Sequence, residues 1–397
     1  MTPRIGIEQR RARLGVRHRL AAGSKAANAE EVARGLVALH ATDAATVHLA
    51  AVARMAEPST ADVERALYDD RTLIRMLGMR RTMFVVPDEV APIVQAACTL
   101  DIAKKQRRLL VQHLTTQGHP ENVPDAEAWL AEVEEATARA LAARGSALPQ
   151  ELAEAEPRLR QQLIMAKGKP YESTPYVSNR VLSLLAMDGR IVRGRPRGSW
   201  LSSQYVWSVM DEWVPGGLAA WSPEDARAEL ARRWLAAFGP APVADLRWWT
   251  GWTAAQTKKA LAEVGPVEVD LDGVAGVALP EDLAPVPDPG PWVALLPALD
   301  PTPMGWTERD WYLGGHRSAL FDSAGNVGPT VWCDGRIAGG WAQRAGGEVV
   351  FRLLEDVGAE ATAAVEAEAA RLTTWLGDVR IIPKFRTPLE RELATGK

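Results

Sequence analysis

The sequence predicts an α+β fold, with tandem winged helix-turn-helix domains followed by a β-rich C-terminal domain. Three observations support this prediction. A helix, a turn, a second helix and a hairpin recur in that order up to three times along the chain. A proline-rich linker then spans residues 282–291. Beyond the linker, short strand-forming runs alternate with glycine turns, which is typical of a small barrel or an antiparallel sheet.

The first predicted domain covers residues 1–120 and is mostly helical. Its helices are recognised by apolar residues at helical spacing, and Ser59 with Asp62 three positions later predicts a capped helix start. The run that ends at Pro87 is β-branched and aromatic, which predicts a short strand. The predicted elements are helices at 30–39 and 44–55, a helix at 63–68 and a strand at 82–87.

The second predicted domain covers residues 121–215 and ends in a hairpin. Its apolar pattern predicts three helices, and a Gly-Arg-Pro-Arg-Gly sequence predicts the hairpin tip. The predicted elements are helices at 125–143, 148–165 and 178–187, a strand at 190–193, a tip at 194–198 and a returning strand at 199–207.

The third predicted domain covers residues 216–281, and the fourth covers residues 290–397. Thr253 and Gln256 form a capping-box pattern that starts the second helix of the third domain. The predicted elements are a helix at 243–249, a helix from 253, a hairpin at 267–278, strands at 292–296, 331–333, 336–341 and 348–354, a helix at 360–376 and a last strand at 379–383.

The composition is that of a folded, soluble protein. The 397 residues include 46 Lys and Arg against 50 Asp and Glu, and 47% of them are hydrophobic. These values exclude a fibrous or wholly disordered chain. The net charge of -4 does not exclude nucleic-acid binding, because a basic surface can be local. No apolar run reaches the roughly 18 residues that a membrane span needs, so we expect no membrane partner and a cytoplasmic, nucleoid-associated location.

Several common chemistries are missing from the sequence. It has no phosphate-binding P-loop, no His-Glu-x-x-His zinc motif and no Gly-x-Ser-x-Gly nucleophile motif. Its two cysteines are too few for a disulfide framework or a cysteine-rich zinc site. We therefore expect neither a metal nor a cofactor, and the sequence disfavours an NTPase, a metalloprotease or an esterase.

The first candidate site is the sequence His40-Ala41-Thr42-Asp43 between two predicted helices. One interpretation is structural, with Thr42 or Asp43 capping the next helix and His40 ending the previous one. The other is that an imidazole, a hydroxyl and a carboxylate face a shared cleft, where they hold a water molecule and stabilise a cation. The two interpretations are compatible, because a capping residue can still present polar atoms.

Basic residues provide the candidate DNA contacts. The hairpin arginines are either a solvated turn or a wing that follows phosphates, and a helical basic stripe allows the same two interpretations. Two lysines on the outer face of the third domain's second helix are a third candidate. The tryptophans near them, including Trp248, are expected in the core more than as base-stacking platforms. The candidate contacts are Arg190, Arg193, Arg195 and Arg197 on the hairpin, Lys104, Lys105, Arg107 and Arg108 on the stripe, and Lys258 and Lys259.

Several ordered blocks of sequence resemble the winged-helix DNA glycosylases of the AlkZ/YcaQ type, over about residues 17–389. The blocks are residues 35–43, 71–82, 296–306, 310–314, 328–332 and 339–343. The resemblance implies tandem winged helices that form a C-shaped DNA cleft, with a C-terminal β-barrel-like domain. It also implies a catalytic role for the 40–43 junction, where the family has a Gln-x-Gln pair followed by Asp. Here His40 and Thr42 replace the two glutamines, and Phe84 replaces a frequent histidine.

The resemblance implies a monofunctional DNA glycosylase that removes N7-alkylguanine, including bulky or crosslinked antibiotic adducts, from duplex DNA. We expect a monomer that hydrolyses the glycosidic bond without lyase activity. His40 would position or deprotonate the water, Thr42 would hydrogen-bond to it, and Asp43 would hold His40 or favour the developing cation. The alternatives are a non-catalytic winged-helix DNA-binding protein or regulator, and a protein-interaction module. The glycosylase hypothesis requires the junction to face an open, positively lined cleft.

Overall fold

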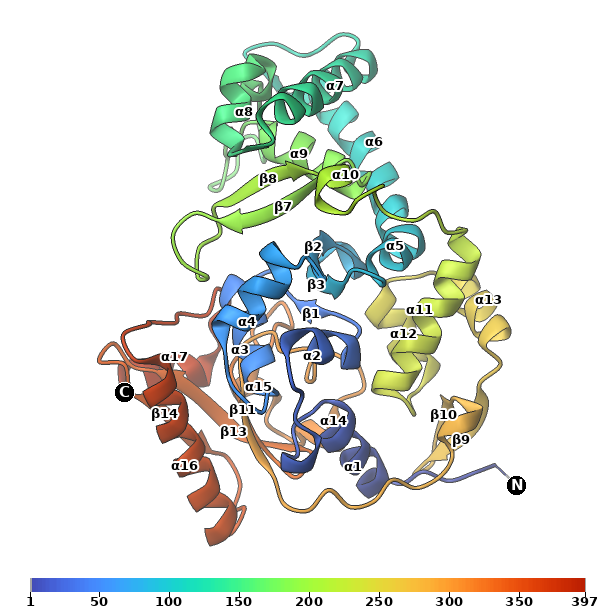
Figure 1. Cartoon of the computed structure of the whole chain (residues 1–397), viewed down its shortest axis with the longest axis vertical. Coiled ribbons are helices and arrows are strands. Elements are labelled where there is room, and N and C mark those ends of the chain that lie inside the picture. The colour runs from blue at the N-terminus through green and yellow to red at the C-terminus, as the bar shows by residue number, and fades with distance from the viewer. Residues whose placement is uncertain (1, 397) are drawn as a thin grey trace.

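The computed structural model describes residues 2–396 and contains many helices with several small antiparallel sheets (Figure 1). The elements of the first 120 residues are α1 (Ile7–Arg17), α2 (Ala29–Gly35), β1 (Leu39–His40), α3 (Ala44–Val52), α4 (Thr60–Glu64), β2 (Leu73–Leu77), β3 (Met83–Pro87), α5 (Ala91–Val94), α6 (Leu100–Gln117) and β4 (Gly118–His119). β3 is the central strand of an antiparallel sheet with the order β1-β3-β2. Ser59 caps α4 as predicted, by accepting a hydrogen bond from the Asp62 backbone N–H at 3.1 Å.

The next segment forms the upper lobe in Figure 1. Its elements are α7 (Ala126–Arg144), β5 (Ser146–Ala147), α8 (Pro149–Ala155), β6 (Gln162–Leu163), α9 (Ser178–Met187), β7 (Ile191–Pro196), β8 (Tyr205–Val209) and α10 (Met210–Trp213). The prediction for α9 is confirmed to the residue. The predicted helix at 148–165 is wrong beyond Ala155, because Pro157 interrupts the helical hydrogen bonds and the chain continues as a 3-10 turn and β6.

The third segment contains α11 (Pro223–Phe238), α12 (Val243–Thr250), α13 (Ala254–Val264), β9 (Val267–Leu271) and β10 (Val274–Ala278). The Thr253–Gln256 capping box is present, and β9 pairs with β10 in the predicted hairpin. The predicted element types are therefore confirmed here. That these units are winged helices framing a DNA cleft stays a prediction.

The C-terminal segment contains β11 (Val293–Leu296), α14 (Asp310–Leu313), α15 (Arg317–Leu320), β12 (Thr330–Cys333), β13 (Arg336–Gln343), β14 (Val349–Leu353), α16 (Ala359–Leu376) and α17 (Pro388–Thr395). Its strands form an antiparallel meander in the order β11-β12-β13-β14. β11 and β14 do not pair within the described chain, so the sheet is open and the expected barrel-like closure is absent. The predicted strand at 379–383 is also wrong, because the Gln343 side chain accepts the Ile381 backbone N–H at 2.8 Å in place of a strand partner.

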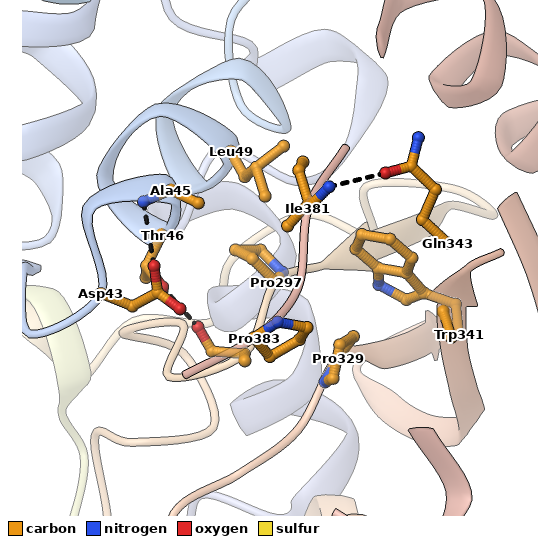
Figure 2. A pocket seen from close by; sticks show the side chains of 12 residues that line it. Asp43, Ala45, Thr46, Leu49, Pro297, Pro329, Trp341, Gln343, Ile381 and Pro383 are labelled. Atoms are coloured by element: carbon orange, nitrogen blue, oxygen red, sulfur yellow. Dashed lines mark hydrogen bonds between the residues drawn. The ribbon is translucent and has the colours of Figure 1, made fainter. Parts of the chain in front are cut away.

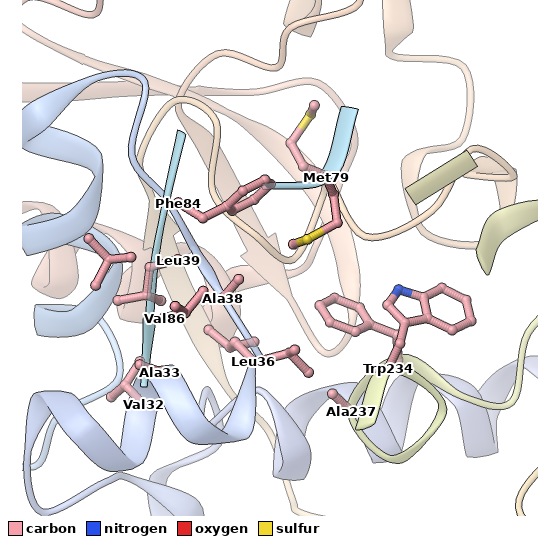
Figure 3. Close-up of a cluster of buried hydrophobic side chains, with 14 of the residues drawn as sticks. Val32, Ala33, Leu36, Ala38, Leu39, Met79, Phe84, Val86, Trp234 and Ala237 are labelled. Atoms are coloured by element: carbon pink, nitrogen blue, oxygen red, sulfur yellow. The ribbon is translucent and has the colours of Figure 1, made fainter. Parts of the chain in front are cut away.

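The largest hydrophobic core joins parts of the chain that are far apart in sequence. Leu36, which follows α2, Met79 and Phe84 belong to this cluster together with Trp234 of α11 (Figure 3). The same cluster continues through the C-terminal sheet to Leu393, whereas residues 103–207 hold a second cluster of their own. The predicted boundaries at residues 120, 215 and 281 stay predictions.

A buried ion pair links the first and last segments. Arg54 and Asp300 are both inaccessible to solvent, and the guanidinium contacts the two carboxylate oxygens at 2.7 and 2.8 Å. Arg54 also donates to the carbonyl oxygens of His18 and Ala50 and to the Thr302 hydroxyl. This network fixes the end of α3, and therefore the helix that begins at the candidate site, against the C-terminal segment.

Candidate functional site

The junction at residues 40–43 lies between a short strand and a helix. His40 ends β1 and is paired with Phe84 of β3, and their rings meet edge to face at 5.6 Å between centroids. The chain reaches β1 through Val37, whose φ of 64° ends the helical run. The predicted helix at 30–39 therefore stops at Gly35. Asp43 then starts α3 by accepting the Ala45 backbone N–H at 3.1 Å, which confirms its predicted capping role.

His40 is buried rather than open to a cleft. Its exposed fraction is 6%, and its Nδ1 accepts a long hydrogen bond from the Thr42 backbone N–H at 3.4 Å. Burial lowers the pKa of His40 to about 3, with a further contribution from the positive charge of Arg80. His40 is therefore a neutral hydrogen-bonding group near pH 7. A base with such a low pKa is poorly matched to proton abstraction at that pH.

Thr42 and Asp43 are half-buried and have different surroundings. The Thr42 hydroxyl makes none of the hydrogen bonds found among residues 2–396. Asp43 has both oxygens engaged, because the second one accepts the Lys384 backbone N–H at 2.9 Å. Asp43 thus does not hold His40, which was one of the two roles expected for it. Its position fixes α3 against the C-terminal segment.

Asp43 also lines a small pocket of about 10 Å³ between α3 and the C-terminal sheet (Figure 2). Trp341, Gln343 and Pro383 contribute from the opposite side, and the Trp341 indole donates to the Leu296 carbonyl oxygen at 2.8 Å. Sequence analysis assigned no site role to these residues. The block at 339–343 was a signal for two of them, because it appeared in the resemblance.

Two arginines lie near the junction. Arg75 of β2 is buried and donates to the Ala41 carbonyl oxygen at 3.2 Å, and its Nε has no partner. Arg80 lies at the tip of the β2–β3 hairpin, and its charge acts on His40. Neither guanidinium forms an ion pair within the described chain. The local potential is therefore positive although the whole protein carries a charge of -4.

Comparison with known proteins identifies the family. Residues 33–375 match the family described as "DNA glycosylase AlkZ-like". The chain belongs to the AlkZ-like DNA glycosylase family. The 40–43 junction, the β2–β3 hairpin and most of the C-terminal sheet lie within the matched residues.

The chain is also similar to a curated protein and to a solved structure from Streptomyces sahachiroi. A curated protein named "Interstrand DNA cross-link repair glycosylase" is 27% identical over 217 residues, which cover 51% of this chain and 56% of the relative. The match thus spans little more than half of that relative's length. The solved structure of the DNA glycosylase AlkZ is similar with a TM-score of 0.69 and 22% identity, over 94% of this chain and 97% of that chain. This similarity shows a shared fold.

The predicted hairpin arginines are held by other side chains. Arg193 is half-buried with its guanidinium over the Trp207 ring, and burial lowers its pKa to about 10. The other three form ion pairs that dock the hairpin, at 2.6, 2.9 and 3.2 Å: Arg190 with Glu135, Arg195 with Asp69, and Arg197 with Glu151. The loop beyond them carries Trp200 to the ring of His48, at 4.9 Å between centroids. A DNA-binding role for these arginines stays a prediction.

The other basic candidates divide in the same way. Arg107 forms two ion pairs at 2.7 Å, with Glu134 and Asp188. These ion pairs connect α6 with α7 and with the end of α9. The remaining basic candidates are exposed: Lys104, Lys105 and Arg108 on α6, and Lys258 and Lys259 on α13. Their role as DNA contacts also stays a prediction.

The described residues contain no group of three or more His, Cys, Asp or Glu side chains arranged to hold a metal ion. In the same part of the chain, no helix combines the length and the apolar character needed to cross a membrane.

Buried histidines give the folded protein a defined sensitivity to acid. Burial lowers the pKa of His18, His40 and His48 to about 3 each. The unfolded chain binds a proton at each near pH 6.5, so between pH 6.5 and 3 the unfolded state holds more protons. The free energy of unfolding should therefore decrease as the pH falls through this window and should not depend on these groups above it.

Urea unfolding followed by tryptophan fluorescence at pH 7.5, 6.5, 5.5 and 5.0 measures this effect. In this range most carboxylates remain ionised, so the histidines dominate. The His48→Leu variant removes one buried imidazole, whose Nε2 has no partner, and should show a smaller decrease. A wild-type free energy that is constant from pH 6.5 to 5.0 would contradict the prediction.

Proposed function

We propose that this protein is a monofunctional DNA glycosylase that hydrolyses the glycosidic bond of N7-alkylguanine in duplex DNA, including bulky or crosslinked adducts. The observation that carries the proposal is the AlkZ-like family match, which includes the 40–43 junction. The curated relative's name, which refers to interstrand cross-link repair, supports an alkylation adduct as the substrate class.

The chemistry of the substrate matches the groups at the junction. Alkylation at N7 makes guanine a cation that leaves as a neutral base, so little acid catalysis is needed. The protein must place a water at C1′ and stabilise a cationic sugar. Because the Nδ1 of the neutral His40 accepts the Thr42 backbone N–H, its Nε2 carries the proton and supplies a hydrogen-bond donor to that water, and the Thr42 hydroxyl supplies a second contact. The Asp43 carboxylate supplies the negative charge that favours the developing cation.

The arginines around the junction act on the DNA rather than on the base. A basic lining attracts the phosphates on both sides of the lesion. Lys384 contacts Asp43 through its backbone N–H, and its ammonium group lies over the ring of Phe385, at 5.9 Å from the centroid. We propose hydrolysis without a lyase step. The hairpin arginines remain proposed phosphate contacts, which would exchange carboxylate partners for phosphates when DNA binds.

Incubation of the protein with a duplex containing 7-methylguanine, followed by heating in base, tests the proposal. We expect strand breaks at the modified guanine only after the alkaline step, because hydrolysis leaves an intact abasic site. Strand breaks without that step would show a lyase and would overturn the monofunctional assignment. An absence of breaks with both 7-methylguanine and a crosslinked duplex would overturn the glycosylase proposal.

The near-complete burial of His40 does not meet the requirement of the glycosylase hypothesis for an open cleft at this residue, and it favours a second candidate, a non-catalytic DNA-binding protein. In that case the junction serves only to connect β1 and α3. Binding of undamaged duplex without excision of either substrate would support this candidate. Sequence-selective retention of undamaged promoter DNA would support a regulator.

A further inference from the structure

Three arginines and two aromatic rings alternate in one continuous stack beside the junction. The Arg80 guanidinium lies over Trp248 at 3.9 Å from the ring centroid, and Arg309 lies over the same ring at 5.0 Å. Arg309 is also 5.0 Å from the Phe321 centroid, and Arg317 lies over Phe321 at 5.3 Å. We call these five residues the arginine ladder.

The ladder is assembled from three distant parts of the chain. Arg80 comes from the tip of the β2–β3 hairpin, Trp248 comes from α12, and the other members come from the region of α14 and α15 (Figure 1). Arg80 has φ of 52°, a conformation that non-glycine residues rarely adopt. Gly251 ends α12 against it, where a Cβ atom would lie 3.1 Å from the Arg80 Cγ. The absence of a side chain at Gly251 thus leaves room for the Arg80 side chain to pack against the end of α12.

The cations of the ladder have no anionic partner. Among residues 2–396, no carboxylate forms an ion pair with Arg80, Arg309 or Arg317, although Glu308 and Asp310 flank Arg309 in the sequence. Arg309 is 5% exposed, and its Nε and Nη2 are buried without a hydrogen-bond partner. The Arg80 Nε is unpartnered as well. Unpaired buried cations and donors are costly, which points to an anion that is bound in the working state.

The stacking geometry defines which anion fits. A guanidinium that stacks on a ring uses its face and leaves its in-plane N–H donors free. Those donors match two oxygens of a phosphate group. Burial and the neighbouring Arg309 lower the pKa of Arg80 to about 10, so it stays cationic at pH 7. Arg317 is exposed at one end of the ladder and Arg80 is half-buried at the other, which gives a row of donors rather than a single site.

We propose that the arginine ladder is a binding site for the DNA sugar-phosphate backbone beside the 40–43 junction, in which the accessible guanidinium groups of Arg80 and Arg317 hold phosphodiesters and the buried Arg309 adds positive charge between them. The proposal rests on the proposed action on DNA and adds the surface that holds the strand next to His40. The site contacts phosphates and not base edges, so it acts on damaged and undamaged duplex alike.

Binding of an undamaged duplex, measured by fluorescence anisotropy from 50 to 300 mM NaCl, tests the ladder. The Arg80→Gln and Arg317→Gln variants should each weaken binding about three- to tenfold at low salt. Each should also reduce the slope of log affinity against log salt by about 0.9, the value for one lost phosphate contact. Arg317 is exposed, so its replacement does not disturb the core. Arg80→Lys keeps the positive charge and should therefore keep most of the salt dependence of binding, although it loses the planar guanidinium that lies over Trp248.

The control is Arg352→Gln, which removes an exposed arginine that is paired with Glu392 at 2.7 Å on β14. It should leave both affinity and slope unchanged. An unchanged slope in the Arg80→Gln/Arg317→Gln double variant would overturn the ladder proposal, even if affinity falls. If the wild-type protein excises no adduct while the two variants show the predicted reductions in slope, the glycosylase function is overturned and the ladder is still supported.

Discussion

Replacing His40 with alanine is expected to lower the single-turnover rate of 7-methylguanine excision by about 10²-fold or more. The reason is that the Nε2–H of the neutral imidazole supplies the fixed hydrogen-bond donor that holds water at C1′. The Kd for duplex DNA should change by only a few-fold, because His40 is 6% exposed and carries no positive charge at pH 7. Single-turnover excision and anisotropy on the same duplex measure the two quantities.

The His40→Gln variant separates positioning from proton abstraction. A glutamine side-chain N–H donates a hydrogen bond as the Nε2–H of a neutral imidazole does, but the amide is not a base. If His40 positions water, this variant should stay within about tenfold of the wild-type rate, and the wild-type rate should show no inflection near pH 6.5. A loss as large as that of alanine would show that positioning alone does not explain the residue. His113→Ala on α6 is the control, and full activity of His40→Ala would remove the residue from the mechanism.

The Asp300→Ala variant is expected to lower the free energy of unfolding by about 3–5 kcal/mol. It leaves the Arg54 guanidinium buried without its carboxylate partner, at a site where both side chains have no exposed area. Urea unfolding followed by tryptophan fluorescence measures the loss. The surface pair Arg352–Glu392 is the matched comparison, because removal of Glu392 should cost about 1 kcal/mol or less.

The Arg54→Met/Asp300→Leu double variant tests the cause of that loss. If the cost arises from an unpaired buried charge, replacing both partners with apolar side chains should recover much of the stability. The remaining loss reflects the hydrogen bonds from Arg54 to His18, Ala50 and Thr302. A double variant that is less stable than Asp300→Ala would show that these bonds, and not the charge, dominate.

Local sequence signals predicted much of the secondary structure. Capping residues such as Ser59 and Thr253 fixed helix starts, because their side-chain hydrogen bonds involve residues only a few positions away. Helix ends were less predictable: Val37 and Pro157 end helical runs within patterns that remain apolar. The open C-terminal sheet was not predictable either. Closure into a barrel depends on whether β11 meets β14, a long-range contact that strand patterns do not encode.

The residue types of the candidate site follow from the sequence, but their environment does not. The residue types at 40–43 indicated an imidazole, a hydroxyl and a carboxylate, and Asp43 caps α3 as expected. The burial of His40 depends on Phe84 and other side chains that fold over it, so its low pKa could not be obtained from spacing. Likewise, Trp248 was assigned to the core, whereas its ring is half-buried between two guanidinium groups.

The division of the hydrophobic clusters has a consequence for synthesis on the ribosome. The cluster of residues 103–207 is complete once the nascent chain has passed Trp207, whereas the cluster that contains Leu36 also needs Leu389 and Leu393, near the last residues translated. The part of the chain that holds this second cluster, residues 103–207, can therefore fold while translation continues. The helices before it keep apolar surface uncovered until the last residues have been translated, and exposed apolar surface of this kind favours aggregation.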